Sequence, residues 1–359
     1  MRLTGRQAAA LAPDRLTPQR SLPERSSQIH ESPDEMPSVR SVLRTVLTQV
    51  DGVRAVRDAA PLDGIPFEGE PPRAVDAEVV EDATLRSIPV RGGPLPGFAA
   101  FLDGRQESRL VAWVGPIVPL VIGTVSAGIQ RRDGRRLRSW GRTLIERRIY
   151  APLALLDADD LRRACHPLPV FDTLTGDDDA SAGLHPQLLQ ERARQAVARH
   201  RERCEQRVAA EWCASESAPL FIDGGIAGSE SLSRNPAAIG VVKSHRTIYG
   251  GTEGMSLALS LAAAERTSVM KIAPRGRTPV HSWYLRTRDP AGRDAFWGLV
   301  RVEVAEGRDV SERAELVSRW ILAEGAPLAA PDPRWDRMAY GVRAVEQALG
   351  AVATRGWRS

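Results

Sequence analysis

The sequence predicts an α/β fold in which helices pack on the faces of a mixed β-sheet. Strand-like segments fill most of residues 98–156, a long helical segment follows, and more strand-like segments lie within residues 218–304 before two closing helices. This order of mostly β, then α, then β, then α is typical of helices layered on a sheet. The chain has 359 residues, of which 42% are hydrophobic, so it can bury a sizeable core.

The N-terminal quarter differs from the rest of the chain. Residues 1–36 are rich in Arg, Pro, Ser and Gln without an apolar period, which predicts a flexible arm. Residues 38–50 carry apolar side chains at helical spacing and predict a helix. Residues 60–97 are rich in Pro and Gly and predict an irregular connection with one or two edge strands. We therefore predict that residues 37–97 are an extension packed on a core domain formed by residues 98–359.

The first β-rich part begins with an apolar segment, residues 98–106, that contains the dipeptide Asp-Gly. Residues 109–137 are strand-like, and Asp133-Gly134 is a typical hairpin turn. Residues 146–156 continue the strand-like pattern, and residues 176–183 form a turn-rich linker.

The second half begins with a helical segment that has few helix-breaking residues, from His185 to Trp212. Strands are predicted within 218–228 and 237–250, a helix over 256–265, three strands over 268–304, and helices over 312–325 and after the Pro-rich residues 330–338.

Charge gives a weak indication of nucleic acid. The chain has 49 basic and 45 acidic side chains, a net charge of +4, and all basic residues except Lys243 and Lys271 are arginine. Arginine suits phosphate oxygens, although a GC-rich coding sequence explains the same bias. The predicted hairpin carries a basic run. It consists of Arg131, Arg132, Arg135, Arg136 and Arg138. This run either grips a DNA backbone or is a solvated hairpin tip.

Several classes of protein are not indicated. The three cysteines show no CxxC spacing, and His166, His185 and His200 lie at no metal-ligand spacing, so neither a disulfide framework nor a zinc site is predicted. The most apolar run, residues 110–122, is too short to span a bilayer. The start of the sequence lacks an apolar signal segment. We expect a cytoplasmic protein that does not enter a membrane.

Two aspartates are the strongest candidates for chemistry. Asp103 in FLDG and Asp223 in FIDG each follow an apolar strand and precede a glycine. Carboxylates at neighbouring strand ends can bind Mg²⁺ or Mn²⁺. Two such ions, about 3.5–4 Å apart, activate water and stabilise the leaving oxygen in phosphodiester hydrolysis. Alternatively, both dipeptides are ordinary turns that do not meet.

These motifs, in this order, resemble those of the NurA nuclease family from about Phe98 to Gln347. The resemblance is carried by FLDGR, a glutamate on a long helix, LFIDGG and AIGVVKSH. It implies an RNase H-like fold related to PIWI domains. It also implies a metal-dependent DNA nuclease with 5'-3' exonuclease and single-strand endonuclease activity.

The resemblance also implies which residues act. Asp103, Glu205 and Asp223 would hold two Mn²⁺ or Mg²⁺ ions. Lys243, which follows the second strand, either positions the phosphate or simply begins a loop. The family glutamate lies about five helical turns before the second aspartate, and Glu205 lies 18 residues before Asp223. Glu202, one turn earlier, is the second choice.

The last helix departs from the family pattern, which has a histidine there. This chain has Tyr340 in that region and Asp336 four residues earlier, and either residue would complete the site. If neither does, catalysis is weak, or the chain is an inactive RNase H-like module that binds DNA or docks onto an ATPase.

Partners follow from the same resemblance. Family members form homodimers and dock onto a hexameric HerA-type ATPase that feeds them DNA. The resemblance implies the same partners here, in DNA-end processing or in phage defence. The chain itself has no P-loop motif, so it is not expected to hydrolyse nucleotides unaided.

Overall fold

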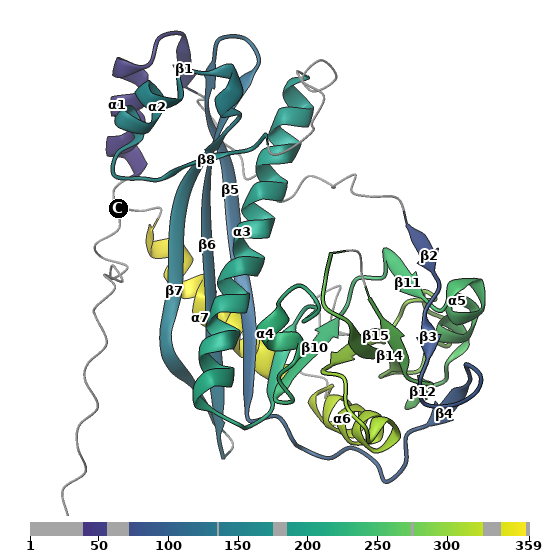
Figure 1. Cartoon of the computed structure of the whole chain (residues 1–359). Helices are drawn as coiled ribbons and strands as arrows, with labels where there is room; N and C mark the ends of the chain where they lie inside the picture. Colours follow the sequence, from purple (N-terminus) through teal and green to yellow (C-terminus); the bar gives the residue numbers. More distant parts are fainter. Residues whose placement is uncertain are drawn as a thin grey trace, which may run out of the picture.

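The structure is a computed structural model of the chain. It describes residues 39–55, 72–134, 136–174, 185–273, 276–325 and 339–356, the last six of these by their backbone alone. The predicted arm, residues 1–36, and the predicted linker, residues 176–183, lie outside the described residues. The predicted fold class is confirmed: a large mixed sheet is flanked by α-helices (Figure 1).

Three long antiparallel strands form the spine of the sheet. They are β5 (Ala100–Val114), β6 (Val118–Asp133) and β7 (Arg136–Ala151). β6 is buried over most of its length. The predicted hairpin turn between β6 and β7 is confirmed, with Gly134 at a positive φ of 58° that favours glycine.

The order of the central strands is β7-β6-β5-β9-β10. β9 (Leu220–Asp223) pairs parallel to β5, and β10 (Ala238–Val242) pairs parallel to β9. The long helix α3 (Pro186–Ser215) leads into β9, and the short helix α4 (Glu230–Ser233) lies between β9 and β10. Three antiparallel strands, then a helix, then two strands parallel to the first, is the predicted RNase H-like arrangement.

Further strands extend the sheet beyond β10. They are β15 (Leu299–Val304), β14 (Val280–Arg286), β13 (Met270–Ile272) and β12 (Glu265–Thr267). β11 (Thr247–Tyr249) lies outside this sheet, and α5 (Gly251–Ser260) follows it. α5 begins and ends five residues earlier than the helix predicted over 256–265.

Parts of the N-terminal extension pair with strands of the core. The predicted helix over 38–50 is confirmed as α1 (Val39–Gln49). Four short strands follow: β1 (Val53–Ala55), β2 (Arg73–Val75), β3 (Glu78–Val79) and β4 (Ser87–Pro89). They pair with β5, β11, β13 and β12 respectively. The division of the chain at residues 97 and 98 stays a prediction.

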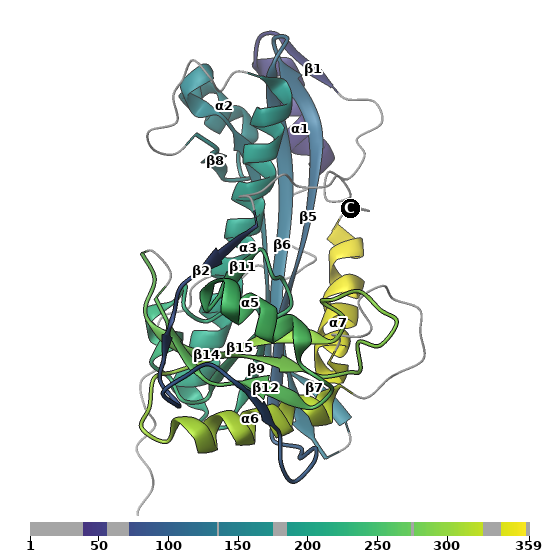
Figure 2. The same ribbon diagram turned by 90° about the vertical axis from the view of Figure 1, so that its right-hand side faces the viewer.

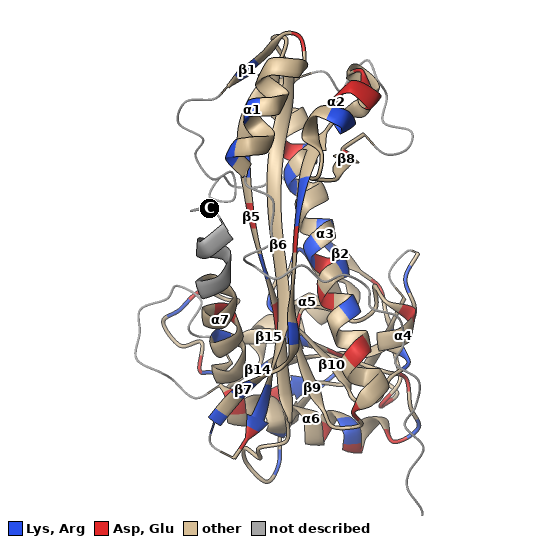
Figure 3. Ribbon diagram, turned by 90° about the vertical axis from the view of Figure 1, so that its left-hand side faces the viewer, with Lys and Arg blue, Asp and Glu red and all other residues tan. Residues whose placement is uncertain are grey.

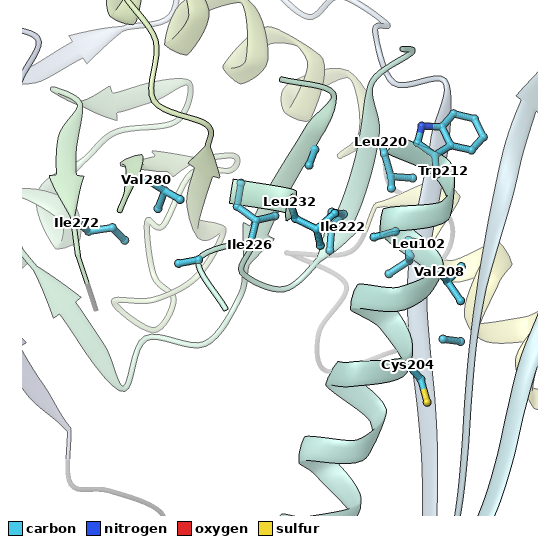
Figure 4. Packing of buried hydrophobic residues seen from close by; sticks show 14 of the residues in the cluster. Leu102, Cys204, Val208, Trp212, Leu220, Ile222, Ile226, Leu232, Ile272 and Val280 are labelled. Carbon is cyan, nitrogen blue, oxygen red and sulfur yellow. The ribbon is translucent and has the colours of Figure 1, made fainter. Parts of the chain in front are cut away.

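Helices cover both faces of the long strands (Figures 1 and 2). α3 packs on one face through a cluster of buried apolar residues that includes Leu102, Val208, Trp212 and Ile222 (Figure 4). α6 (Val310–Glu324) and α7 (Tyr340–Gly356) belong to a second cluster built around the Phe101 side of β5.

The far ends of β5, β6 and β7 carry a third apolar cluster, shared with two helices. These are α1 and α2 (Ala158–Cys165); the short strand β8 (Val170–Asp172) pairs with β7 beside them. In the part of the chain that the structure describes, no helix is long and apolar enough to cross a membrane.

Candidate active site

Asp103 and Asp223 come together at one point of the sheet. β5 and β9 pair in parallel up to Leu102 and Ile222, so the next residues, the two aspartates, occupy equivalent positions on adjacent strands. Such positions are about 4.8 Å apart and face the same side of a sheet. The two Asp-Gly segments therefore meet, as the metal hypothesis requires.

The role of the first Asp-Gly pair differs from the sequence prediction. Asp103 and Gly104 do not end a strand, because β5 continues to pair with β6 opposite Gly128 and Ala127. What ends beside them is the pairing between β5 and β9. Asp103 thus lies on a continuous, rigid strand at the place where its neighbour leaves it.

Glu205 reaches this place from α3, across Gly104. A Cβ atom at residue 104 would lie 2.1 Å from Oε1 of Glu205, so a side chain there would displace the carboxylate. This contact explains why glycine follows Asp103. Glu205 is buried, whereas Glu202 and Glu211 on the same helix are exposed. Of the two predicted candidates, Glu205 and Glu202, the structure brings Glu205 to the aspartates.

Two of the three carboxylates, Asp103 and Glu205, have raised pKa values. Burial, followed by repulsion from Asp223 and Glu205, raises the pKa of Asp103 to about 8. Burial raises the pKa of Glu205 to about 7, with Asp223 and Glu202 adding to it and Arg201 opposing it. The negative charge of the cluster is therefore only partly compensated.

Two cations do contact the cluster. Nζ of Lys243 lies 2.8 Å from Oδ2 of Asp223, and Nη1 of Arg201 lies 2.5 Å from Oε1 of Glu205. The structure thus brings the predicted Lys243 to Asp223. Sequence reasoning missed Arg201, although its position four residues before Glu205 was a signal for an ion pair on one helix face.

A buried glutamate holds the turn after Asp223. Oε2 of Glu303 accepts hydrogen bonds from the backbone N–H groups of Ile226 and Ala227, at 2.8 and 3.3 Å. Arg301 donates to its other oxygen at 2.8 Å. Glu303 was not predicted from the sequence either; the available signal was an acidic residue within the strand-like segment LVRVEV.

The donor chemistry of Asp103, Glu205 and Asp223 fits Mg²⁺ or Mn²⁺, which prefer carboxylate oxygens. The raised pKa values of Asp103 and Glu205 indicate that the site can accept more positive charge. The ligand oxygens of the three carboxylates are farther apart than in a compact metal site, however. Among the described residues, the carboxylates of these three do not form a group whose ligand atoms all lie within 4.8 Å of one another.

One group of described residues does meet that spacing: Glu146, His200 and Cys204. It could hold a metal ion, and the sequence analysis missed it by treating His200 as incidental. Cys204 stands four residues after His200, one turn along α3, which was the available signal. Both ring nitrogens of His200 are in hydrogen bonds, Nε2 with Glu146 at 2.7 Å and Nδ1 with Tyr150 Oη at 2.6 Å.

Glu146 in this group is surrounded by positive partners. Arg148 donates to it at 2.6 Å, and Arg207 pairs with its other oxygen. These bonds, with that from His200 first, hold the pKa of Glu146 well below its usual range. Burial raises the pKa of the Cys204 thiol to about 12, so this thiol stays protonated at neutral pH. A metal ion bound here would have to displace the thiol proton of Cys204 and compete with the cationic partners of Glu146.

The other predicted site residues are not brought to the carboxylates by any described contact. Tyr340 begins α7 and is 46% exposed. Its neighbour Gly341 packs directly against the ring of Phe101, two residues before Asp103. Asp336 lies outside the described residues.

Most of the predicted DNA-binding arginines that the structure describes have acidic partners. Arg131 pairs with Glu216 at 2.9 Å, Arg132 with Glu324 at 2.7 Å, and Arg138 with Asp133 at 3.1 Å. Figure 3 shows positive and negative segments along the same strands and along α3. Arg136 is exposed, and Arg135 lies outside the described residues. A role of this hairpin in DNA binding stays a prediction.

Comparisons with known proteins find similarity among solved structures. No family model matches the chain, and no curated protein matches it. Among solved structures, the chain is similar to the NurA nuclease from Sulfolobus solfataricus, with 11% sequence identity. The similarity covers 78% of this chain and 87% of that one, at a TM-score of 0.39. At this level the likeness carries no argument about the site.

Proposed function

We propose that the protein is a metal-dependent DNA nuclease that hydrolyses phosphodiester bonds. The observation that carries this proposal is the meeting of Asp103, Glu205 and Asp223 where β9 leaves β5. Three carboxylates from a continuous strand, a helix and a strand end form an acidic site in which Asp103 and Glu205 are buried and Asp223 is partly exposed. Carboxylates placed close together and away from water repel one another and destabilise the fold. Carboxylates with such perturbed pKa values cluster at functional sites.

Mn²⁺ or Mg²⁺ would be held by Asp103, Glu205 and Asp223. When bound, the ions would activate water and neutralise charge on the phosphate. Lys243, paired with Asp223 at 2.8 Å, would orient a phosphate beside that carboxylate. Tyr340 or Asp336 would complete the site.

A second candidate function is a catalytically weak or inactive module that binds DNA or docks onto an ATPase. One observation favours it: Lys243 and Arg201 already contact Asp223 and Glu205. Two cations compensate part of the charge that a metal would otherwise neutralise.

The deciding experiment incubates the purified protein with Mn²⁺ and end-labelled single- and double-stranded DNA. We expect cleavage by the wild type and none by Asp223→Asn. Glu211→Gln, which removes an exposed carboxylate on α3, serves as the control and should cut normally. Cleavage by Asp223→Asn at the wild-type rate would exclude this site. A wild type that never cuts, even beside its ATPase, would favour the second candidate.

The proposal extends to partners and to the cell. We propose a homodimer that works with a HerA-type hexameric ATPase in the cytoplasm, in DNA-end processing or phage defence. Size-exclusion chromatography with light scattering, alone and with the ATPase, tests the assembly. A monomer that does not bind the ATPase would remove this part of the proposal and leave the nuclease activity to be judged separately.

A further inference from the structure

Arg201 lies beside the carboxylates and contacts Glu205. It lies on α3 one turn before Glu205, and its Nη1 reaches Oε1 of that residue at 2.5 Å. The side chain is 27% exposed, so part of it faces solvent. It is therefore both inside the acidic site and within reach of a ligand that arrives from outside.

The charges around Arg201 come from the whole site. Burial lowers its pKa, but Glu205, Asp103, Glu202 and Asp223 together raise it above the usual value. The guanidinium thus interacts electrostatically with all three carboxylates of the proposed metal site. A divalent cation bound there would repel it and compete with it for Glu205.

The other positive groups near the site are engaged differently. Lys243 is a point charge on Asp223. Arg207, farther along α3, pairs with Glu146 in the separate histidine network. Arg132 pairs with the buried carboxylate of Glu324 and lies 4.9 Å above the ring of Phe101, which gives it a structural role.

Arg201 has donors to spare. A guanidinium carries five N–H donors in a flat fork that matches two oxygens of a phosphate. The contacts described for Arg201 use one donor, on Nη1. The same Arg–carboxylate pair would exchange readily for an Arg–phosphate pair, because both are charge-assisted hydrogen bonds of similar geometry.

We propose that Arg201 binds a backbone phosphate of the DNA strand once a metal ion takes Glu205. This inference rests on the proposed nuclease function and names a residue for substrate contact that the sequence did not indicate. In the metal-free protein, Arg201 forms an ion pair with Glu205 and neutralises its charge. In the loaded protein, it would hold the strand beside the carboxylates.

The test measures DNA binding without requiring cleavage. The affinity for a fluorescein-labelled single-stranded oligonucleotide is measured by anisotropy across a salt series, in EDTA and in Ca²⁺. Loss of one phosphate contact lowers the slope of log K against log[salt] by about 0.7 for single strands. We expect Arg201→Ala to show this loss in Ca²⁺, which amounts to about a 2.6-fold change in relative affinity between 50 and 200 mM salt.

Two further variants separate a phosphate contact from a structural role. Arg201→Lys keeps the charge and should keep the slope. Arg234→Ala removes an exposed arginine that pairs with Glu230 at the same i, i+4 spacing, and its slope should match the wild type. If Arg201 only stabilised α3, Arg201→Ala would lower the melting temperature and leave the slope unchanged.

The outcomes distinguish this inference from the proposed function. If the wild type cuts DNA and Arg201→Ala keeps the full slope in Ca²⁺, the role of Arg201 is wrong and the nuclease proposal stands. If the wild type neither binds nor cuts DNA, both fail. If the slope falls by the expected amount but the wild type does not cut, Arg201 binds phosphate in the second candidate function.

Discussion

Adjacent residues of α3 belong to two charged clusters with opposite character. Glu205 joins Asp103 and Asp223, where carboxylates outnumber the cations that touch them. Cys204, labelled in Figure 4, lies beside Glu146 and His200, where a single carboxylate has three hydrogen-bonding partners from side chains. One helix thus carries an under-compensated site and a satisfied network. The satisfied network joins His200 on α3 to Glu146 and Tyr150 on β7. The under-compensated site is the one whose negative charge favours binding of a cation.

The two clusters respond to pH with opposite signs. Glu146 has a lowered pKa in the folded protein, so it stabilises the fold above its ordinary pKa of 4.5, and this contribution is lost as pH falls below that value. Asp103 has a raised pKa of about 8 against 3.8 in its ordinary state. Between those values the folded protein binds more protons than the unfolded one, so its stability falls as pH rises.

The largest expected effect comes from Asp103→Asn. This variant should lose nuclease activity by a factor on the order of 10⁴, as when one member of a catalytic unit is removed. It should also raise the free energy of unfolding at pH 8 by about 2 kcal/mol, because a buried and repelled charge is gone. Denaturant titrations at pH 8 and pH 5 measure the second effect, which should shrink at the lower pH. A loss of stability at pH 8 would contradict the under-compensated character of this cluster.

Glu146→Gln should have the reverse effect on stability. It removes the acceptor shared by His200, Arg148 and Arg207, and these positive or polar partners remain partly buried. The free energy of unfolding should fall by about 2–3 kcal/mol near pH 7, within the range for a broken, partly buried ion pair. The same denaturant titrations measure this, with Glu230→Gln, which breaks an exposed pair, as the control. A variant as stable as the wild type would show that the network does not anchor α3.

Metal addition should stabilise the protein through the first cluster only. A ligand that binds the folded state raises its stability by about 2.7 kcal/mol at 100 times its Kd. Mn²⁺ should therefore raise the melting temperature of the wild type and of Cys204→Ala, and leave that of Asp223→Asn unchanged. Scanning calorimetry after chelation with EDTA gives the baseline. A Mn²⁺ response that Cys204→Ala loses would move the metal site to Glu146, His200 and Cys204.

The contrast between the clusters also shows how far the sequence could predict this molecule. Apolar periodicity and Asp-Gly dipeptides were sufficient for the mixed sheet, the β6–β7 hairpin and α1, because these are local patterns. The convergence of Asp103 and Asp223 could be proposed because both follow apolar strands. The Glu146, His200 and Tyr150 contacts join residues 50 or more positions apart across α3 and β7, and no local pattern fixes such a pairing.

The buried position of Asp103 within a continuous strand could not be predicted from the sequence either. Its dipeptide with Gly104 has the form of a turn, yet β6 continues the ladder on the other side of β5. Whether a strand ends depends on all its neighbours, and only the tertiary arrangement shows that one neighbour leaves while the other stays. The contact between Gly104 and Glu205 has the same origin, since it depends on the packing of α3 on the sheet.

The smallest expected effect is that of Tyr150→Phe, which tests the satisfied network alone. It removes one hydrogen bond of 2.6 Å to Nδ1 of His200 and leaves the ring packing unchanged. The free energy of unfolding should fall by about 1 kcal/mol, the net value of a typical hydrogen bond with some cost for the unpaired nitrogen. Nuclease activity and the response to Mn²⁺ should stay at the wild-type level, because Tyr150 has no described contact with Asp103, Glu205 or Asp223. A variant that keeps its stability but loses activity would show that the two clusters are coupled through α3, and that the network positions Glu205 as well as the helix.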